Sequence, residues 1–372
     1  MKKKYIKRQA CFACTTPYQI LGAINIAKGL KLDADLYIFG NFDHFDTVAE
    51  KLQKYGFFAN VYSAVGIKRM AKHTKGMALV ETVFPEKFAA EFAPKDVCYD
   101  AFYTTSRAHE KTLLNRVLQK RNPDMELVLY EDGLGSYMRE KFVYRASPSR
   151  RKLEKLLGWK LDHPEKTSVM LNLPEMARLP KWLESRPLTQ MPRNVLTEEE
   201  QRQLLDTFGV EDGSQIQHPV IIFDTLRGKG GYAALNERIP KLDACYEVIS
   251  QALGKENIIY KGHPRSRERT PVDIEEYRNT GIPMELLYMD MPDLEDRLLI
   301  CYNSTAVFTP KMLCGKEPVV IALFGIVDGE TDTGMSELCD RFRDIYEKKD
   351  RIYTPATMEE LKACLEQIRQ NA

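Results

Sequence analysis

The chain has 372 residues, which is too long for one compact core and favours two domains of about 150–200 residues each. Hydrophobic residues make up 44% of the composition and charged residues 29%, which excludes a disordered, collagenous or coiled-coil protein. The 54 Lys and Arg residues balance the 53 Asp and Glu residues, so no overall positive field favours nucleic-acid binding. We therefore expect any anionic ligand to be bound by a local cluster of charges.

Short apolar runs alternate with helical patterns, which predicts an α/β protein with parallel sheets and crossover helices. The expected strands of the first half are 10–14, 35–39, 60–62, 97–103 and 126–130, with helices at 17–29, 47–55 and 107–121. The expected strands of the second half are 220–223, 257–260, 286–288, 299–302 and 318–321. We therefore expect two Rossmann-like domains, at 1–145 and 216–356, with an insertion and proline-punctuated linker at 146–215 and a C-terminal amphipathic helix at 357–372.

The eight cysteines are scattered and show no dense framework, which favours free thiols in a reducing cytoplasm. Cys11 and Cys14 have the spacing of a metal or redox motif, but the surrounding apolar run favours a buried strand. The apolar stretch after the basic N-terminus is too short for a signal peptide. No window approaches the roughly 18 apolar residues that a membrane span requires.

An acidic motif, Glu131-Asp132-Gly133, directly follows the apolar strand expected at 126–130. That position is the carboxyl edge of a parallel sheet, where α/β enzymes bind their ligands. Two adjacent carboxylates repel each other, which raises the pKa of one of them and suits a general base near neutral pH. The alternative is an acidic turn in which Gly133 supplies a positive φ.

A cationic motif follows a strand of the second half and contains Lys261, His263, Pro264 and Arg265. Three basic side chains within five residues at the end of a strand suit the binding of a phosphate. Farther along, the expected strand 299–302 leads into hydroxyl residues, Ser304 and Thr305. These hydroxyls either cap a helix or bind the same phosphate together with free backbone amides.

Two further segments carry candidate ligands for a nucleotide. Glu285 follows Pro283 and Met284, and its carboxylate could accept hydrogen bonds from both hydroxyls of a ribose; the alternative is an ordinary exposed glutamate. Asp224 and Thr225 open a glycine-rich loop after the strand 220–223, and Asp224 is a second candidate for the base. That loop either wraps a donor or is a plain surface loop, and it lacks the P-loop pattern.

The order of these motifs resembles that of the bacterial sialyltransferases of GT-B type. Their shared marks are two acidic residues before Gly, a His-Pro pair, and a later Ser-Ser or Ser-Thr pair. The chain is most similar to glycosyltransferase family 52, the lipooligosaccharide sialyltransferases, which are related to the capsular polysialyltransferases. The segment 14–21 also resembles the opening strand and helix of that family.

The resemblance implies a role for each motif. Asp132 would be the base that deprotonates the acceptor hydroxyl, and His263 would bind the cytidylate phosphate and assist its departure. Ser304 and Thr305 would hold the same phosphate. The ribose would contact Glu285, and the cytosine would contact the backbone of Pro283 and Met284. Charge alone adds Lys261 and Arg265 to the phosphate site.

The implied enzyme is an inverting, metal-independent sialyltransferase with an N-terminal acceptor domain and a C-terminal CMP-donor domain on either side of a cleft. It would move sialic acid from CMP-Neu5Ac, a co-substrate, to a terminal galactoside of a lipooligosaccharide or capsule-like glycan, with no cofactor. The alternatives are a transferase for another CMP-activated nonulosonate or Kdo, and a catalytically silent nucleotide- or glycan-binding protein. Asp33 and Asp35 formally match the metal-binding pattern of GT-A transferases, but they precede their strand, so we expect no metal there.

The expected location is the cytoplasm. The basic segment 149–160 also contains Leu153, Leu156, Leu157 and Trp159. It would either touch the anionic inner face of a membrane, where glycolipid acceptors lie, or pack between domains or in a homodimer. We expect no nucleic-acid partner.

Overall fold

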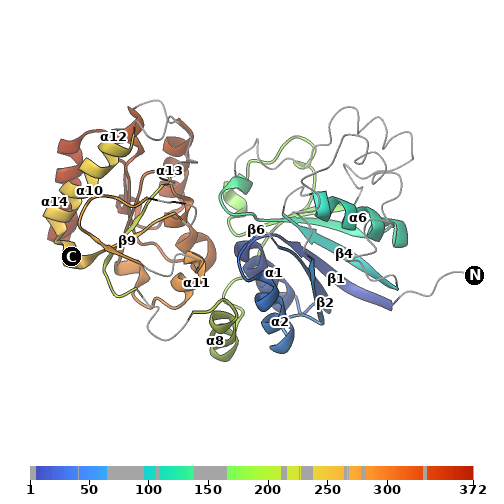
Figure 1. The fold of residues 1–372 in the computed structure, drawn as a ribbon. Coiled ribbons are helices and arrows are strands. Elements are labelled where there is room, and N and C mark those ends of the chain that lie inside the picture. The colour runs from blue at the N-terminus through green and yellow to red at the C-terminus, as the bar shows by residue number, and fades with distance from the viewer. Residues whose placement is uncertain are drawn as a thin grey trace, which may run out of the picture. The chain divides into compact units, whose positions relative to one another are not determined.

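The computed structural model describes residues 6–40, 42–64, 96–105, 109–137, 166–210, 216–225, 227, 238–263, 266, 268–277, 282–329 and 333–371. The chain divides into two compact units, Met1–Gly209 and Val210–Ala372 (Figure 1). Each unit is built on a parallel sheet with helices, which confirms the predicted α/β class. The basic segment 149–160, expected to touch a membrane or to pack between domains or in a homodimer, lies outside the described residues.

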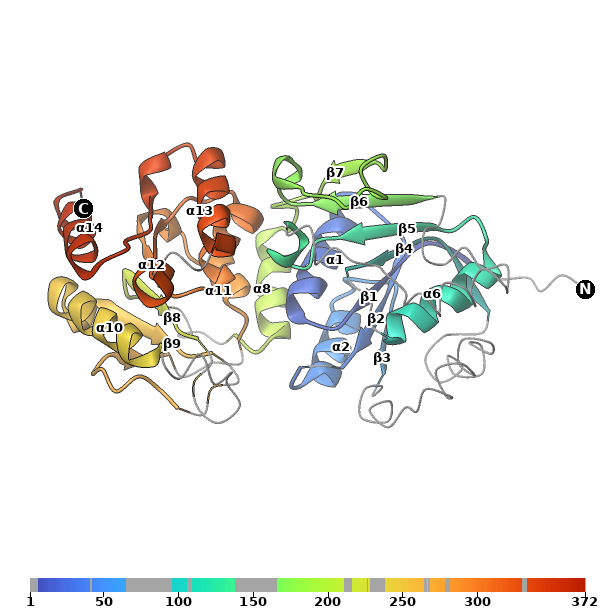
Figure 2. The same cartoon turned by 90° about the horizontal axis from the view of Figure 1, so that it is seen from above.

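The first unit contains a seven-stranded sheet in the order β3-β2-β1-β4-β5-β6-β7, as Figure 2 shows. Its strands are β1 (Ile6–Cys14), β2 (Ala34–Phe39), β3 (Asn60–Ala64), β4 (Val97–Thr104), β5 (Glu126–Tyr130), β6 (Thr167–Leu171) and β7 (Leu188–Gln190). Every neighbouring pair is parallel. The chain therefore runs outward from β1 in one direction to β3, and then from β4 in the other, so the topological switch lies between β1 and β4.

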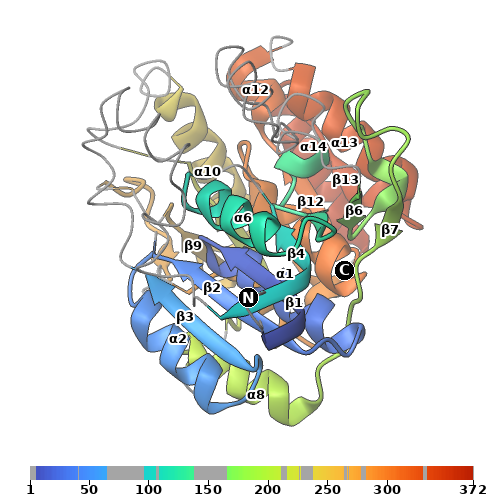
Figure 3. The ribbon, with the colours of Figure 1, turned by 90° about the vertical axis from the view of Figure 1, so that its right-hand side faces the viewer.

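The helices of this unit lie on both faces of the sheet, with α6 on one face and α1 and α2 on the other (Figures 1 and 3). They are α1 (Pro17–Gly29), α2 (Phe45–Lys54), α6 (His109–Arg121), α8 (Glu198–Thr207) and the short 3₁₀ helices η1 (Gly135–Tyr137) and η2 (Pro174–Met176). Thr16 caps α1 by accepting a hydrogen bond from the Gln19 amide, and Pro17 occupies the first helical turn. A capping box of Thr197 and Glu200 begins α8.

The second unit contains a six-stranded parallel sheet in the order β10-β9-β8-β11-β12-β13. Its strands are β8 (Val220–Phe223), β9 (Ile258–Lys261), β10 (Glu275–Glu276), β11 (Leu298–Cys301), β12 (Val319–Ala322) and β13 (Ile352–Tyr353). The four residues of β8, β9 and β11 are all buried, as expected for strands covered on both faces. The switch lies between β8 and β11.

The helices of the second unit include the predicted C-terminal helix, which packs against α10 within the same unit (Figure 2). They are α10 (Ile239–Leu253), α11 (Met284–Met289), α12 (Phe324–Asp328), α13 (Thr333–Ile345), α14 (Met358–Asn371), the 3₁₀ helices η3 (Lys255–Asn257), η4 (Leu294–Asp296), η5 (Thr305–Val307) and η8 (Lys349–Arg351), and the π-helix η6 (Pro310–Cys314). Leu361 and Leu365 of α14 have no exposed surface. The Met358 and Cys245 sulfur atoms lie 3.9 Å apart, at the contact with α10.

Two sequence-based expectations differ from the structure. The apolar run 286–288 is not a strand but part of α11, since Pro283 at the N-cap begins a helix there. The segment 146–215 is not only a linker, because its described part supplies β6 and β7 to the first sheet. Val169 and Leu171 of β6 are fully buried, and this apolar burial outweighs the surrounding prolines that suggested a loop.

Cys11, Cys14 and Asp35 are buried in strands of the first sheet, whereas Asp33 is exposed directly before β2, so only Asp33 precedes its strand as expected. Cys11 and Cys14 have no exposed surface in β1, as the buried-strand interpretation predicts. Asp35 is also fully buried, and accepts hydrogen bonds from Asn60 at 2.9 Å and from the Tyr99 hydroxyl at 2.8 Å. In the described part of the chain, no helix is long and apolar enough to cross a membrane.

The packing of α14 predicts a stability effect. Replacing the buried Leu365 by Ala removes apolar contacts with the second unit and should lower its free energy of unfolding by about 2–5 kcal/mol. Glu366→Ala, at the neighbouring exposed position, should leave it unchanged. Urea unfolding followed by circular dichroism measures the difference. Equal stability of the two variants would contradict the packing of this helix.

Candidate functional site

Asp132 lies at the carboxyl edge of the first sheet, two residues after β5, and its side chain is exposed. Gly133 adopts a φ of +69° and turns the chain into η1. The turn is held by the Asp132 amide, which donates to Ser136 Oγ at 2.7 Å. The Asp132 carboxylate accepts a hydrogen bond from Gln19 Nε2 at 2.7 Å. It is therefore an oriented carboxylate that a substrate can reach.

Glu131 has a different role from its neighbour, because its side chain has no exposed surface. Its carboxylate accepts hydrogen bonds from the hydroxyls of Tyr18 and Tyr137, from Asn172 N at 2.9 Å and from Asn172 Nδ2 at 2.8 Å. Burial raises the pKa of Glu131, and these hydrogen bonds oppose the rise. The expected repulsion between paired carboxylates is therefore not the main cause. The contacts make Glu131 an anchor for the loop rather than a ligand for a substrate.

Two residues to which the sequence analysis gave no role complete this edge. Gln19 is 2% exposed in the first turn of α1, and Lys111 is 1% exposed in the first turn of α6. Lys111 Nζ donates to Gln19 Oε1 at 2.8 Å. The strands before these helices are β1 and β4, so both residues lie at the topological switch. The sequence feature that could have identified Gln19 and Lys111 is a polar residue in the first turn of a helix that follows a buried strand.

The residues predicted to bind the phosphate end or follow strands of the second sheet, at its carboxyl edge. Lys261 is the last residue of β9 and is 7% exposed. Its Nζ donates to the Ile282 carbonyl at 3.3 Å and lies 5.0 Å from the centre of the Tyr277 ring. Burial lowers the pKa of Lys261 to about 8, and the nearby charge of Glu285 opposes this shift. Within the described residues no carboxylate forms an ion pair with Lys261, which leaves a buried cation suited to an anionic group.

The other residues expected to bind the nucleotide donor follow β9 or β11 at the same edge of the second sheet, or lie at the start of α11. His263 is partly exposed two residues after β9, and its carbonyl accepts a hydrogen bond from Ser266 N at 2.8 Å. Pro264 and Arg265 lie outside the described residues. Ser304 is partly exposed three residues after β11 and caps η5 by accepting from Ala306 N at 3.3 Å, while Thr305 is exposed. The capping interpretation of Ser304 is confirmed, and the Thr305 side chain remains accessible.

The ribose candidate and its neighbours lie at the start of α11. Pro283 is the N-cap residue, Met284 is buried, and Glu285 is partly exposed in the first turn. Burial raises the pKa of Glu285, whereas its own backbone amide and the charge of Lys261 lower it. This electrostatic link places Glu285 and Lys261 in one environment.

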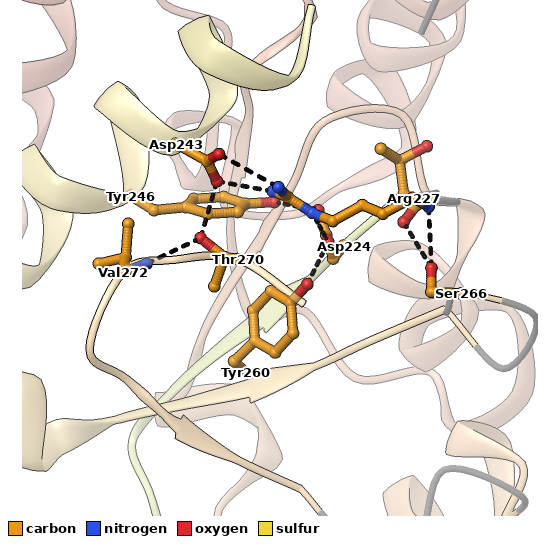
Figure 4. A network of polar contacts seen from close by, with 9 residues as sticks. Asp224, Arg227, Asp243, Tyr246, Tyr260, Ser266, Thr270 and Val272 are labelled. Carbon is orange, nitrogen blue, oxygen red and sulfur yellow. Dashed lines mark hydrogen bonds and ion pairs between the residues drawn. The ribbon is translucent and has the colours of Figure 1, made fainter. Parts of the chain in front are cut away.

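Asp224, the second candidate for the base, belongs to a buried network at the end of β8 (Figure 4). It is 5% exposed and accepts hydrogen bonds from Arg227, from the Tyr260 hydroxyl and, at 3.0 Å, from the Tyr246 hydroxyl. Arg227 also pairs with Asp243 at 2.8 Å. Burial lowers the pKa of Arg227, but the hydrogen bonds to Asp224 and Asp243 outweigh this effect and raise it. These contacts favour a structural role for Asp224.

The same network reaches the loop that follows β9. The Arg227 amide donates to Ser266 Oγ at 2.9 Å, and that hydroxyl donates to the Thr225 carbonyl at 3.2 Å. Thr225 therefore contributes its backbone to the network, and its side chain is partly buried. Because Ser266 also binds the His263 carbonyl, the buried Asp224–Arg227 pair supports the position of His263.

The described residues contain no group of three or more His, Cys, Asp or Glu side chains placed to hold a metal ion.

Comparisons with known proteins find no matching protein family and no curated protein of significant sequence similarity. Among solved structures, UDP-N-acetylglucosamine 2-epimerase from Rickettsia bellii is 14% identical with a TM-score of 0.42, covering 98% of this chain and 88% of that one. The α,α-trehalose-phosphate synthase (UDP-forming) from Burkholderia vietnamiensis is 9% identical with a TM-score of 0.37, covering 98% and 96%. A UDP-glucosyltransferase from Polygonum tinctorium is 9% identical with a TM-score of 0.39, covering 99% and 94%. Likenesses of this size carry no argument about activity.

The buried network of the second unit predicts a large loss of stability when its carboxylate is removed. Asp224→Asn leaves the buried Arg227 without one of its two carboxylate partners and should cost about 3–5 kcal/mol. Asp273→Asn is the matched control, since Asp273 forms an exposed pair with Lys255 and should change nothing measurable. Both tryptophans, Trp159 and Trp182, belong to the first unit.

Circular dichroism and tryptophan fluorescence together locate this effect. We expect Asp224→Asn to move a circular-dichroism transition that tryptophan fluorescence does not follow. A variant as stable as the wild type would show that the network does not hold the second unit together.

Proposed function

We propose that the protein is an inverting glycosyltransferase that moves sialic acid from CMP-Neu5Ac to a hydroxyl of a terminal galactoside. The observation that carries the proposal is Asp132, an exposed carboxylate at the carboxyl edge of the first sheet that Gln19 holds in one orientation. The choice of CMP-Neu5Ac rests on the order of the acidic, His-Pro and Ser-Thr motifs.

The proposed reaction is a single displacement at the anomeric carbon of the sialic acid. Asp132 takes the proton of the acceptor hydroxyl as its oxygen forms the new glycosidic bond. The bond to the phosphate oxygen breaks, and CMP leaves with both bonding electrons. A base on one side of the carbon and a phosphate-binding group on the other invert the configuration.

The second unit supplies the groups proposed for CMP. Lys261 is a buried cation at the end of β9, and His263 follows it after one glycine. Together with Ser304 and Thr305 at the end of β11, these side chains meet the charge of a departing phosphate. Glu285 would accept from the ribose hydroxyls, next to the positive charge of Lys261.

The first test is calorimetric binding of CMP, with UMP, GMP and UDP for comparison. We expect selective binding of CMP, at least tenfold weaker for His263→Ala because a charge-assisted hydrogen bond to the phosphate is lost. His218→Gln is the control, since His218 lies in the same unit before β8 and pairs with Glu275. CMP affinity no higher than that for UMP would exclude the proposed donor, and equal binding by the His263 variant would exclude His263 as a ligand of the phosphate.

The second test is transfer of sialic acid to lactose. Asp132→Asn removes the base and should lower kcat by about 10²–10⁴-fold while CMP binding is unchanged. The matched control is Asp124→Asn, an exposed aspartate that precedes β5 at the opposite edge of the sheet. Retention of kcat by Asp132→Asn would assign the base to another residue. CMP binding without any transfer would favour a silent binding protein or a different CMP-activated sugar.

A further inference from the structure

We propose that Lys111 is a positioning residue that fixes the orientation of the Asp132 carboxylate through the side-chain amide of Gln19. This inference rests on the proposed function of Asp132 as the base. It gives a role to two residues, Lys111 and Gln19, to which the sequence analysis assigned none, although Gln19 lies in the segment 14–21.

The orientation of the Gln19 amide follows from the chemistry of its neighbours. Its Oε1 atom receives hydrogen bonds from Thr15 N at 2.7 Å, Thr15 Oγ1 at 3.1 Å and Lys111 Nζ at 2.8 Å. An ammonium group and a backbone N–H can only donate, so the oxygen must face them. The NH₂ group therefore faces Asp132 Oδ1 and donates to it at 2.7 Å.

The rest of Gln19 is held equally firmly. Its backbone amide donates to Thr16 Oγ1 at 3.3 Å, and its carbonyl accepts from the Tyr130 hydroxyl at 3.0 Å. Tyr130 is the last residue of β5, directly before the acidic motif. Among these contacts, the one with Lys111 carries a charge that a proton can remove, and Lys111 also donates to Thr105 Oγ1 at 3.2 Å.

The charge on Lys111 depends on pH in an accessible range. Burial lowers the pKa of Lys111 to about 8, while Cys14 of β1, Asp132 after β5 and Glu110 of α6 oppose the shift. The folded chain therefore releases this proton at a lower pH than the unfolded chain, whose lysine has a pKa of 10.5. Stability contributed by this group rises with pH through that window. A loss of activity just above pH 8 would not be explained by unfolding at this residue.

The experiment measures kcat at saturating donor, and KM for the donor with its concentration varied, on both sides of pH 8 for the wild type, Lys111→Gln and Lys111→Arg. We expect the wild-type kcat to fall with a midpoint near pH 8 as the charge-assisted bond to Gln19 is lost. Lys111→Gln should have a kcat about 10–100-fold lower with no midpoint there, and Lys111→Arg should recover part of kcat and keep it above pH 8. At each pH, KM for the donor should be the same in the two Lys111 variants as in the wild type. Lys261 has a similar pKa, but its titration should affect donor binding.

Two controls address folding. Lys28→Gln removes a cation from the exterior of α1, where Lys28 pairs with Glu200 at 2.7 Å, and should keep the wild-type profile. Gln19→Met breaks the connection in the middle while Lys111 remains, and should reproduce the loss of kcat. A wild-type kcat and pH profile in either Lys111→Gln or Gln19→Met would overturn the proposal.

A measurement that needs no activity separates this inference from the proposed function. The side-chain NH₂ resonances of Gln19, identified by their absence in Gln19→Met, should shift with a midpoint near pH 8 in the wild type and not in Lys111→Gln. This titration without sialyl transfer would mean that the function is wrong and the connection is real. Transfer without this titration would mean that the positioning role is wrong.

Discussion

The organisation of the first unit depends on the burial of the Glu131 carboxylate. A carboxylate removed from water is stable only when its oxygens are fully hydrogen-bonded, and here the donors come from three separate elements. Tyr18 belongs to α1, Tyr137 to η1, and Asn172 follows β6. The hydrogen bonds that the Glu131 carboxylate requires therefore bring these elements together at one edge of the sheet. Asp132 is exposed beside them as a consequence.

The second unit uses the same physical solution at its own edge. Asp224 directly follows β8, as Glu131 follows β5, and each buried carboxylate accepts from two tyrosine hydroxyls. In the second unit Arg227 adds a charge and extends the network to the loop that holds His263. In both units an acid next to a strand serves as an anchor. In the first unit, Asp132, the proposed base, is the exposed residue next to this anchor.

Much of the fold could be predicted from the sequence because parallel strands buried on both faces read as short apolar runs. The strands 126–130 and 220–223 and the helix 17–29 have the bounds that their patterns predicted. The prediction was wrong at 286–288, where a helix of six residues is as apolar as a strand. It also missed β6 and β7, because the prolines around them indicated a loop. In these segments local composition does not distinguish the alternatives, and packing against the sheet decides them.

The sequence by itself determined the α/β class, the two sheets and the positions of the acidic, cationic and hydroxyl motifs at strand ends, since these follow from local periodicity and turn chemistry. Only the tertiary structure separated the two adjacent acids into a buried anchor and an exposed base candidate, because burial depends on which elements pack around each side chain. The tertiary structure also brought Gln19 to Asp132 across 113 residues of sequence, and Lys111 to Gln19 across 92. No spacing rule connects such positions, since they meet only where the carboxyl ends of β1, β4 and β5 share one edge.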